Sequence, residues 1–318
     1  MLARREHVER CVACGGTEVT ASFKAPLQMA PPRERFRFSE CGTCGLLYLS
    51  ERIVADDIHR YYDESYLPHR GATAWGPFAG LVRRGQEQQD RRRVRRLADL
   101  VTLGPDDRLL DIGCGRPTFL REVVRATGTK ATGIDVVVEP FLDDPEFAGV
   151  DLQAGDPREI ELEGTFQAIT MWHYLEHDYD PGGTLRTLLP HSGPDTVLLI
   201  EVPDARSLAR AWGGNQWAGL HTPRHTAIYT PDAMGRLLRE SGWEVVASEL
   251  APTLDPWVLW WLTWRERRGT DWTRSMARYL PEFLLGSLLL GPFVRRRSSD
   301  VLLVAARPAG ADTGQGPA

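Results

Sequence analysis

The segment Leu109-Leu110-Asp111-Ile112-Gly113-Cys114-Gly115, which continues into Arg116-Pro117-Thr118-Phe119-Leu120, decides the fold of this chain. Its first half has the pattern of a short buried strand, its two glycines form a turn, and its last residues begin a helix. Glycines at such a turn let backbone N–H groups approach an anionic or polar ligand, and the positive end of the following helix points to the same place. The segment therefore predicts a ligand-binding strand–turn–helix unit.

Two acidic residues further along the chain extend this pattern. Asp135 lies twenty residues after Gly115, at the end of the strand-like run 131–134, where a carboxylate can accept hydrogen bonds from ribose hydroxyls. Asp156 follows another short strand candidate in Ala154-Gly155-Asp156. Each acid alone is also a common turn or cap residue, so the indication comes from the ordered set.

From residue 107 onward, short apolar strands alternate with helical segments, which is typical of a parallel α/β sheet. Ligands bind at the carboxyl ends of the strands in such sheets, so we expect the loops that carry Gly113, Asp135, Asp156 and Trp172 to converge. The expected strands are 108–112, 131–135, 149–153, 167–172, 196–202, 243–249 and 300–306.

Several motifs, taken in their order and spacing, resemble class I S-adenosylmethionine-dependent methyltransferases. They are Asp111-Ile112-Gly113-Cys114-Gly115, Gly133-Ile134-Asp135, Gly155-Asp156 and Leu175-Glu176-His177. The later Pro223-Arg224-His225, with Ala227-Ile228-Tyr229-Thr230-Pro231 and Gly242-Trp243, is similar to the bacterial branch that includes quinone-biosynthesis methyltransferases. The resemblance covers roughly residues 90–250. One position departs from it, because Pro117 stands where the family usually has glycine.

This resemblance implies S-adenosylmethionine as the cofactor and a Rossmann-like seven-stranded methyltransferase sheet. At the family's positions, backbone amides around Gly113 and Gly115 approach the methionyl part of the cofactor, and Asp111 holds the loop or the amino group of the cofactor. Asp135 accepts from the ribose hydroxyls, and Asp156 accepts from the adenine amino group.

Methyl transfer from a sulfonium is a direct displacement, so such an enzyme mainly aligns the nucleophile and excludes water. Trp172 can face the cationic sulfur. A hydroxyl nucleophile also needs a base, and histidine suits this role near neutral pH. His225 is the first candidate, because the loop after the fifth strand commonly contributes to the substrate side; His177, His173 and His221 are the others. A structural role for each histidine, including ordering of the loop beside the cofactor, is the alternative.

The N-terminal region carries two C-x-x-C turns, Cys11-Val12-Ala13-Cys14 and Cys41-Gly42-Thr43-Cys44, each followed by glycine. Paired turns of this kind aim four thiolates at one point, which favours a tetrahedral zinc site over two redox or free thiol pairs. The expected zinc ligands are Cys11, Cys14, Cys41 and Cys44. We expect Cys114 to be a small buried residue and not a ligand.

A zinc ribbon with a Cys-Gly-Leu continuation and a Tyr-Tyr-x-x-x-Tyr stretch recurs in methyltransferases of bacterial sugar and natural-product pathways. Cys44-Gly45-Leu46 and Tyr61-Tyr62-Asp63-Glu64-Ser65-Tyr66 resemble that arrangement. We therefore interpret the ribbon as a structural or substrate-covering module. The tyrosines either line the substrate cleft or pack between the domains.

The segment 81–103 reads as a helix with many arginines. We interpret this run as a solvated helix face, since Glu87, Asp90 and Asp99 dilute the positive charge. A patch that grips phosphate or nucleic acid is the alternative. The arginines are Arg83, Arg84, Arg91, Arg92, Arg93, Arg95 and Arg96.

After Trp243 the chain departs from a minimal methyltransferase. Four tryptophans recur at helical spacing and predict a tryptophan-rich helix face; they are Trp257, Trp260, Trp261 and Trp264. The apolar run 283–294 is too short and too interrupted to span a bilayer. Burial or a homodimer interface, a lid over an apolar substrate, and peripheral membrane contact are the three interpretations.

Composition restricts the function further. The chain has 318 residues, of which 42% are hydrophobic and 25% charged, so it can bury a core and is not a disordered polymer. Its net charge of -5 argues against a nucleic-acid binder. No apolar stretch follows the N-terminal Met1-Leu2-Ala3-Arg4-Arg5, so we expect no signal peptide and a cytoplasmic protein. The expected substrate is a small molecule: a sugar, a lipid-linked intermediate or a specialised metabolite.

These patterns predict a division of the chain into five parts. They are a zinc ribbon (1–50), a connector and basic helix (51–103), a cofactor-binding core (104–250), a helical insertion with the last strand (251–308) and a disordered tail (309–318).

Overall fold

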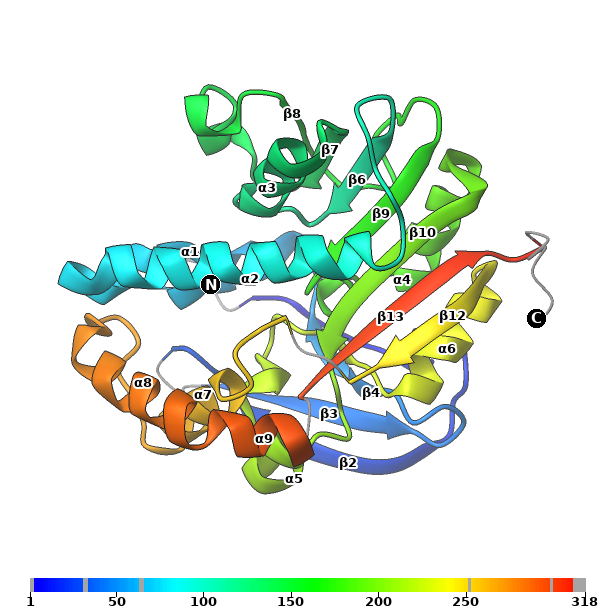
Figure 1. Cartoon of the computed structure of the whole chain (residues 1–318). Helices are drawn as coiled ribbons and strands as arrows, with labels where there is room; N and C mark the ends of the chain where they lie inside the picture. Colours follow the sequence, from blue (N-terminus) through cyan, green and yellow to red (C-terminus); the bar gives the residue numbers. More distant parts are fainter. Residues whose placement is uncertain (1–2, 31–33, 63–65, 251–252, 298–299, 311–318) are drawn as a thin grey trace.

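A seven-stranded mixed β-sheet forms the centre of the computed structural model, which describes residues 3–30, 34–62, 66–250, 253–297 and 300–310. Its strands are β6 (Arg108–Ile112), β7 (Lys130–Asp135), β8 (Val150–Ala154), β9 (Phe166–Trp172), β10 (Ser192–Pro203), β12 (Trp243–Glu249) and β13 (Val301–Pro308). Their order is β12-β13-β10-β9-β6-β7-β8. From β10 to β8 all neighbours are parallel, whereas β13 is antiparallel to both β10 and β12 (Figure 1). The predicted Rossmann-like sheet is confirmed.

The predicted strands form with small shifts at their ends. Strand β10 begins at Ser192 instead of residue 196, because an irregular stretch pairs with the start of β9 before the regular ladder begins at Val197. Strand β9 is buried along nearly its whole length, as expected for an inner parallel strand with both faces covered. The predicted tail lies, from residue 311 onward, outside the described residues.

Helices cover both faces of the sheet. They are α1 (Leu67–Arg70), α2 (Ala79–Ala98), α3 (Thr118–Thr127), α4 (Pro181–Leu188), α5 (Leu208–Gly213), α6 (Pro231–Glu240), α7 (Val258–Arg267), α8 (Leu280–Leu289) and α9 (Gly291–Arg297). Successive strand residues face opposite layers: Leu109 packs in the cluster that contains α3, and Leu110 packs with residues of α4 and α6. The side chains of Asp180 and Thr230 cap α4 and α6.

The N-terminal ribbon is built into the core. Its strands are β1 (Arg5–His7), β2 (Val19–Pro26), β3 (Arg35–Cys41), β4 (Leu47–Leu49) and β5 (Glu51–Ile53). A short strand from the other end of the core, β11 (Ala227–Ile228), pairs antiparallel with β4 and completes the sheet β11-β4-β3-β2. Cys11 and Tyr48 of the ribbon share one apolar cluster with Tyr229 and Met234. The ribbon and the core therefore form one packed unit.

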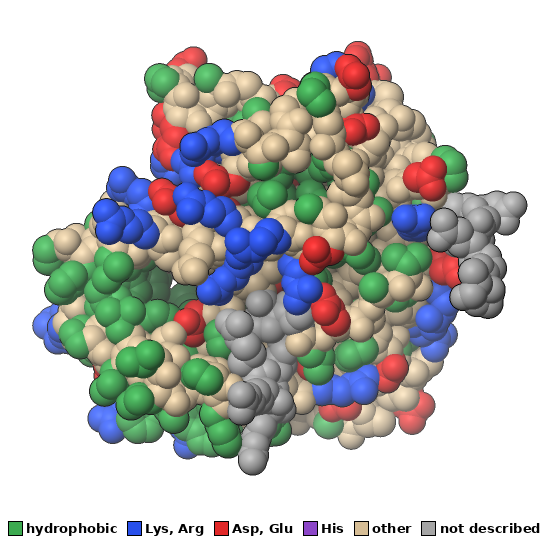
Figure 2. Space-filling model, viewed as in Figure 1, with side chains coloured by type: hydrophobic (Ala, Val, Ile, Leu, Met, Phe, Trp, Pro, Cys, Tyr) green, Lys and Arg blue, Asp and Glu red, His purple; other side chains and the backbone are tan. Residues whose placement is uncertain are grey.

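Helix α2 corrects two expectations about the basic segment. It ends at Ala98, and the residues up to 103 lie beyond it. Blue side chains follow this helix in Figure 2, and Arg91 is exposed as a solvated face requires. Arg93 instead turns inward with a side chain only 14% exposed, and its guanidinium lies 3.6 Å from Asp90 and 3.7 Å from Glu201. The helix is therefore a solvated face on one side and a packed face on the other.

The helical insertion also differs from the expected tryptophan-rich face. Trp261 is buried, whereas Trp264 is 38% exposed, so the tryptophans of α7 point in different directions. Helix α8 leaves leucines in solvent, with Leu288 at 74% and Leu289 at 65% exposed. Phe283 and Val294 pack inward, but burial within this chain does not account for these exposed leucines. The homodimer interface, the lid and the membrane contact all stay predictions. No helix in the described ranges is long and apolar enough to cross a membrane.

The inward position of Arg93 leads to a testable difference between two neighbouring arginines. Arg93→Gln should lower the free energy of unfolding by about 1–3 kcal/mol, because it leaves the buried carboxylate of Glu201 with one cation fewer. Arg91→Gln, at an exposed position of the same helix, should change it by less than about 0.5 kcal/mol. Urea unfolding of both variants measures this, and equal stability would place Arg93 in solvent.

Candidate active site

The glycine loop after β6 is hydrogen-bonded to the end of β7. Gly113 and Gly115 have φ values of +72° and +49°, which other residues adopt rarely. The N–H of Gly115 donates to Oδ2 of Asp135 at 2.8 Å, and Oδ1 of Asp135 accepts from the N–H of Val137 at 3.2 Å. A Cβ atom added at Gly115 would meet nothing within 4 Å. The loop therefore presents backbone to open space beside a carboxylate at the end of β7.

Asp111 anchors the loop from inside the sheet. It is 3% exposed, and its Oδ1 accepts from the hydroxyl of Thr170 at 2.6 Å. Burial raises the pKa of its carboxyl to about 7, although the hydrogen bond from Thr170 and the charge of Arg93 oppose this. A carboxyl in this position holds the ends of β6 and β9 together.

Asp156 follows β8 and is engaged by a neighbour. Its Oδ1 accepts from the backbone N–H and from Nε of Arg158, both at 2.9 Å. This side-chain hydrogen bond lowers the pKa of Asp156, against the effect of burial. Between the two strand ends, Val136 is 74% and Val137 is 51% exposed. Sequence reasoning missed these valines. The pattern that could have found them is an apolar pair directly after the acid that ends a strand.

Trp172 at the end of β9 is nearly enclosed. Its ring packs edge-on against Phe119 with the ring centres 5.3 Å apart, and the guanidinium of Arg93 lies 4.9 Å above it. Its Nε1 is buried and has no hydrogen-bond partner within the described residues. The tryptophan thus lies at the carboxyl end of an inner strand, and its indole N–H has no hydrogen-bond partner among the described residues.

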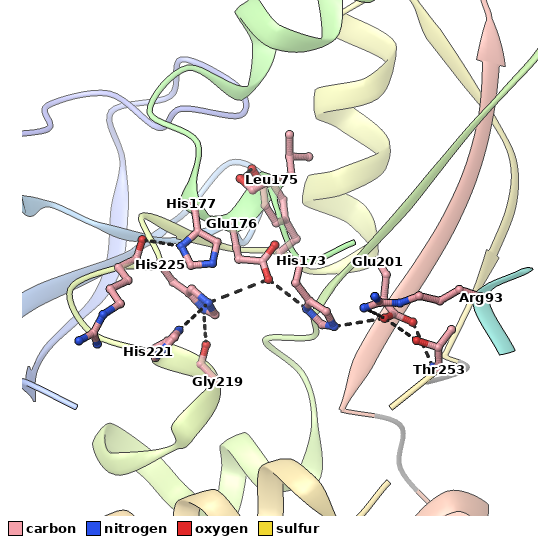
Figure 3. A network of polar contacts seen from close by, with 12 residues as sticks. Arg93, His173, Leu175, Glu176, His177, Glu201, Gly219, His221, His225 and Thr253 are labelled. Carbon is pink, nitrogen blue, oxygen red and sulfur yellow. Dashed lines mark hydrogen bonds and ion pairs between the residues drawn. The ribbon is translucent and has the colours of Figure 1, made fainter. Parts of the chain in front are cut away.

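His173 lies between two carboxylates that are fully buried. Its Nδ1 is 3.1 Å from Oε1 of Glu176, and its Nε2 is 3.2 Å from Oε1 of Glu201 (Figure 3). Burial by itself lowers the pKa of His173, but the two carboxylates outweigh it and raise the pKa to about 9. Its ring is therefore protonated near neutral pH and cannot accept a proton there. Sequence reasoning missed Glu201, an acid inside an apolar strand.

The other three histidines form a separate cluster. The rings of His177 and His225 are 4.5 Å apart between centres, and Nδ1 of His221 lies 3.2 Å from Nε2 of His225. Burial lowers the pKa of all three, so these imidazoles are neutral at neutral pH. Tyr62 and Tyr66 cover the cluster, with hydroxyls 2.9 Å from Nδ1 of His177 and 3.0 Å from Nε2 of His221.

The four ribbon cysteines form the second cluster. Their sulfur atoms all lie within 4.8 Å of one another, and Cys11–Cys44 and Cys14–Cys41 are each 3.6 Å apart. A tetrahedral zinc ion with Zn–S bonds of about 2.3 Å places its sulfurs about 3.8 Å apart. The four thiols therefore fit a zinc ion with little movement.

Comparison with known proteins identifies the family. The family model described as a methyltransferase domain matches residues 83–248, which is more than half of the chain. The chain belongs to this methyltransferase family. It is an S-adenosylmethionine-dependent enzyme of class I.

Solved structures share the fold at low sequence identity. A candidate sarcosine dimethylglycine methyltransferase from Galdieria sulphuraria is 16% identical, with a TM-score of 0.51, and the match covers 72% of this chain and 88% of that one. A coclaurine N-methyltransferase bound to N-methylheliamine and S-adenosylhomocysteine is 12% identical, with a TM-score of 0.50, over 69% of this chain and 70% of that one. Comparison with curated proteins gave no match.

The methyltransferase fold thus brings the expected residues to one edge of the sheet, in separate groups. Gly115 meets Asp135 directly, Gly113 is bonded to the neighbouring Ile134, and Asp156 follows the outermost strand. Trp172 lies at the end of β9, and the histidine cluster follows in the loops beyond it. His173 is not part of that cluster, because the carboxylates on its two sides hold it apart.

The cysteine cluster predicts a metal-dependent ribbon. Purified methyltransferase should carry one zinc ion at the ribbon, and Cys44→Ser should lose most of it and lower the melting temperature, because so small a ribbon needs its metal to fold. Cys114→Ser, outside the cluster, should keep that zinc. Elemental analysis and thermal melts measure both. Full zinc content in Cys44→Ser would exclude these ligands.

The raised pKa of His173 predicts a pH-dependent stability. A histidine whose folded pKa lies above its ordinary 6.5 contributes stability that is fully present below pH 6.5 and is lost as the pH rises through about 9. His173→Gln lacks this contribution. The difference in the free energy of unfolding between the wild type and this variant should therefore shrink from pH 6.5 to pH 9. Urea unfolding at both pH values measures it. A constant difference would mean that His173 is neutral throughout.

Proposed function

We propose that this methyltransferase binds S-adenosylmethionine at the carboxyl ends of β6, β7 and β8 and methylates a hydroxyl group of a small molecule. The hydrogen bond from Gly115 to Asp135 is the observation that supports it most, because it joins the glycine loop to the acid at the next strand end. The cofactor supplies an electrophilic methyl group on a sulfonium. The protein has to bind, orient and shield the two reactants.

The cofactor side fits this proposal at several points. Gly115 leaves open space where a side chain would stand, and Asp135 has lone pairs left for the ribose hydroxyls. The exposed Val136 offers an apolar surface on which an adenine ring can lie, which explains a large apolar side chain in solvent. We propose that Asp156, which follows β8, accepts from the adenine amino group beside its contacts with Arg158. Asp111 supports the loop from below.

The acceptor side lies beyond the end of β9. His225 donates from Nδ1 to the backbone carbonyl of Gly219 at 2.9 Å, so its Nε2 carries the lone pair and can take up a proton. His177 and His221 surround it, and Trp172 ends the strand that leads into the loop of His177. Histidine as the base, and Trp172 near the sulfonium, are the roles that we propose.

The N-terminal part supports an acceptor of limited size. Tyr62 and Tyr66 of the connector reach over the histidines, which supports a substrate-covering role for this part of the chain. This supports a zinc ribbon that braces the cover, as in the sugar and natural-product methyltransferases that the sequence resembles. We propose a sugar, a lipid-linked intermediate or a specialised metabolite as the acceptor, in preference to nucleic acid.

Cofactor binding can be tested without knowledge of the acceptor. Asp135→Ala should weaken the binding of S-adenosylhomocysteine by about ten- to a hundredfold, the usual cost of a lost charge-assisted hydrogen-bond pair. Asp151→Ala, an exposed acid on β8, should bind as the wild type does. Calorimetry on both folded variants decides it. Unchanged affinity in Asp135→Ala would move the ribose contact to another residue.

A further inference from the structure

Three histidines from two separate loops converge on one buried point. His177 lies in the loop after β9, and His221 and His225 lie between β10 and β11. One ring nitrogen of each lies within 4.8 Å of the corresponding nitrogens of the other two. Figure 3 shows the three rings side by side, with His173 and its second carboxylate on the far side of Glu176. The cluster is therefore distinct from His173, to which Oε1 of Glu176 links it.

Each imidazole is oriented by a hydrogen bond at its outer nitrogen. Nδ1 of His225 lies 2.9 Å from one backbone carbonyl oxygen, and Nδ1 of His177 lies 3.2 Å from another. Nε2 of His221 lies 3.0 Å from the hydroxyl of Tyr66. Metal-binding histidines are held in this way, because the outer hydrogen bond fixes the ring and leaves the inner nitrogen as the ligand.

The spacing of the inner nitrogens suits a small divalent cation. Zinc binds imidazole nitrogen at about 2.0–2.1 Å, which places two nitrogens of a tetrahedral site about 3.3 Å apart. The measured separation between Nδ1 of His221 and Nε2 of His225 is 3.2 Å. The remaining separations are no larger than 4.8 Å, so shifts of roughly 1 Å bring all three nitrogens onto one ion.

A buried negative charge lies beside the cluster. Glu176 is fully buried, and its Oε1 is 4.0 Å from Nε2 of His225. Its Oε2 has no hydrogen-bond partner in the part of the chain that the structure describes. A buried carboxylate with an unsatisfied oxygen is costly unless positive charge compensates it. The protonated His173 supplies positive charge at Oε1 of Glu176 but shares it with Glu201. A cation held by the three imidazoles would add positive charge on the other side of Glu176.

We propose that His177, His221 and His225 bind a zinc-type divalent cation and leave one coordination position open to an oxygen of the methyl acceptor. Three protein ligands with an open position is the arrangement of catalytic zinc sites, and structural sites use four. His177 is half-buried, whereas His221 and His225 are buried. The assignment of the acceptor oxygen rests on the proposed function, whereas metal binding does not. With the ion bound, Nε2 of His225 is a metal ligand and no longer the base, and the ion would take over that role by lowering the pKa of the acceptor hydroxyl.

The alternative is a chain of hydrogen bonds without metal. In it the hydroxyl of Tyr66 donates to His221, His221 donates to His225, and His225 donates to the carbonyl of Gly219. The two arrangements differ in the proton on Nδ1 of His221, which a metal ion displaces. Direct metal titration therefore separates them.

Cobalt titration of the full chain, with the ribbon zinc left in place, is the test. The wild type should bind one further equivalent of Co²⁺, and its visible spectrum should lack the sulfur-to-cobalt charge-transfer band that thiolates give. His225→Gln and His177→Gln should each bind it at least about tenfold more weakly. His59→Gln, at an exposed histidine, should match the wild type.

Each sample is also tested for S-adenosylhomocysteine binding, which shows that it is folded and examines the proposed function separately. No Co²⁺ or Zn²⁺ bound beyond the ribbon equivalent, in wild-type protein that binds S-adenosylhomocysteine, would overturn the metal site in favour of the hydrogen-bond chain. Equal cobalt binding by the wild type and both cluster variants would also overturn it, because the ion would then lie elsewhere.

The open position has its own probe. Acetohydroxamate binds metals through oxygen, so its addition should change the spectrum of the bound Co²⁺ if a coordination position is available. An unchanged spectrum would make the ion a closed structural site and overturn the assignment of an acceptor oxygen. The wild-type titration suffices for this result, even if the variants fail to fold.

Discussion

The backbone of Thr226 is hydrogen-bonded on both sides, and the arrangement of the site depends on it. Its N–H donates to the carbonyl of Glu176 at 2.7 Å, and its carbonyl accepts from the N–H of Leu49 at 2.8 Å. One residue thus joins the loop after β9 to the N-terminal ribbon, and β11 continues this contact by pairing with β4. Buried backbone groups left unpaired are costly, so the ribbon and the histidine loops hold each other in place.

Buried charges link the basic helix to the same region. Glu201 accepts from the N–H and the hydroxyl of Thr253 at 3.0 and 2.8 Å, and it also faces His173 and Arg93. Burial alone would raise its pKa, but the hydrogen bond and charge of His173, with the charge of Arg93, lower it. Helix α2, the sheet and the insertion therefore meet at one ionised carboxylate (Figure 3). This explains why helix α2, which has an exposed face of arginines, also has one arginine, Arg93, that points inward.

Local patterns predicted the pieces of the candidate site better than their grouping. The glycine loop, Asp135 and the cysteine pairs have fixed spacings along the chain, so the sequence displays them directly. The four histidines were named as alternative candidates for the base, and the sequence did not show that three of them cluster while Glu176 lies between His173 and His225. Val136 and Glu201 were missed, because their importance depends on exposure and on contacts that a strand pattern does not contain.

The sequence by itself determined the strands of a methyltransferase sheet, the cysteine set for a metal and the acids at the strand ends. These features depend on periodicity and on short spacings, which backbone geometry converts into structure with little help from distant residues. Tertiary structure alone decided that β11 completes the ribbon sheet, that Arg93 turns inward, and that His177 meets His221 and His225. The reason is physical. Segments far apart in the chain pack together to bury apolar surface and to pair their polar groups. The local sequence pattern of a segment does not specify which distant segment it contacts.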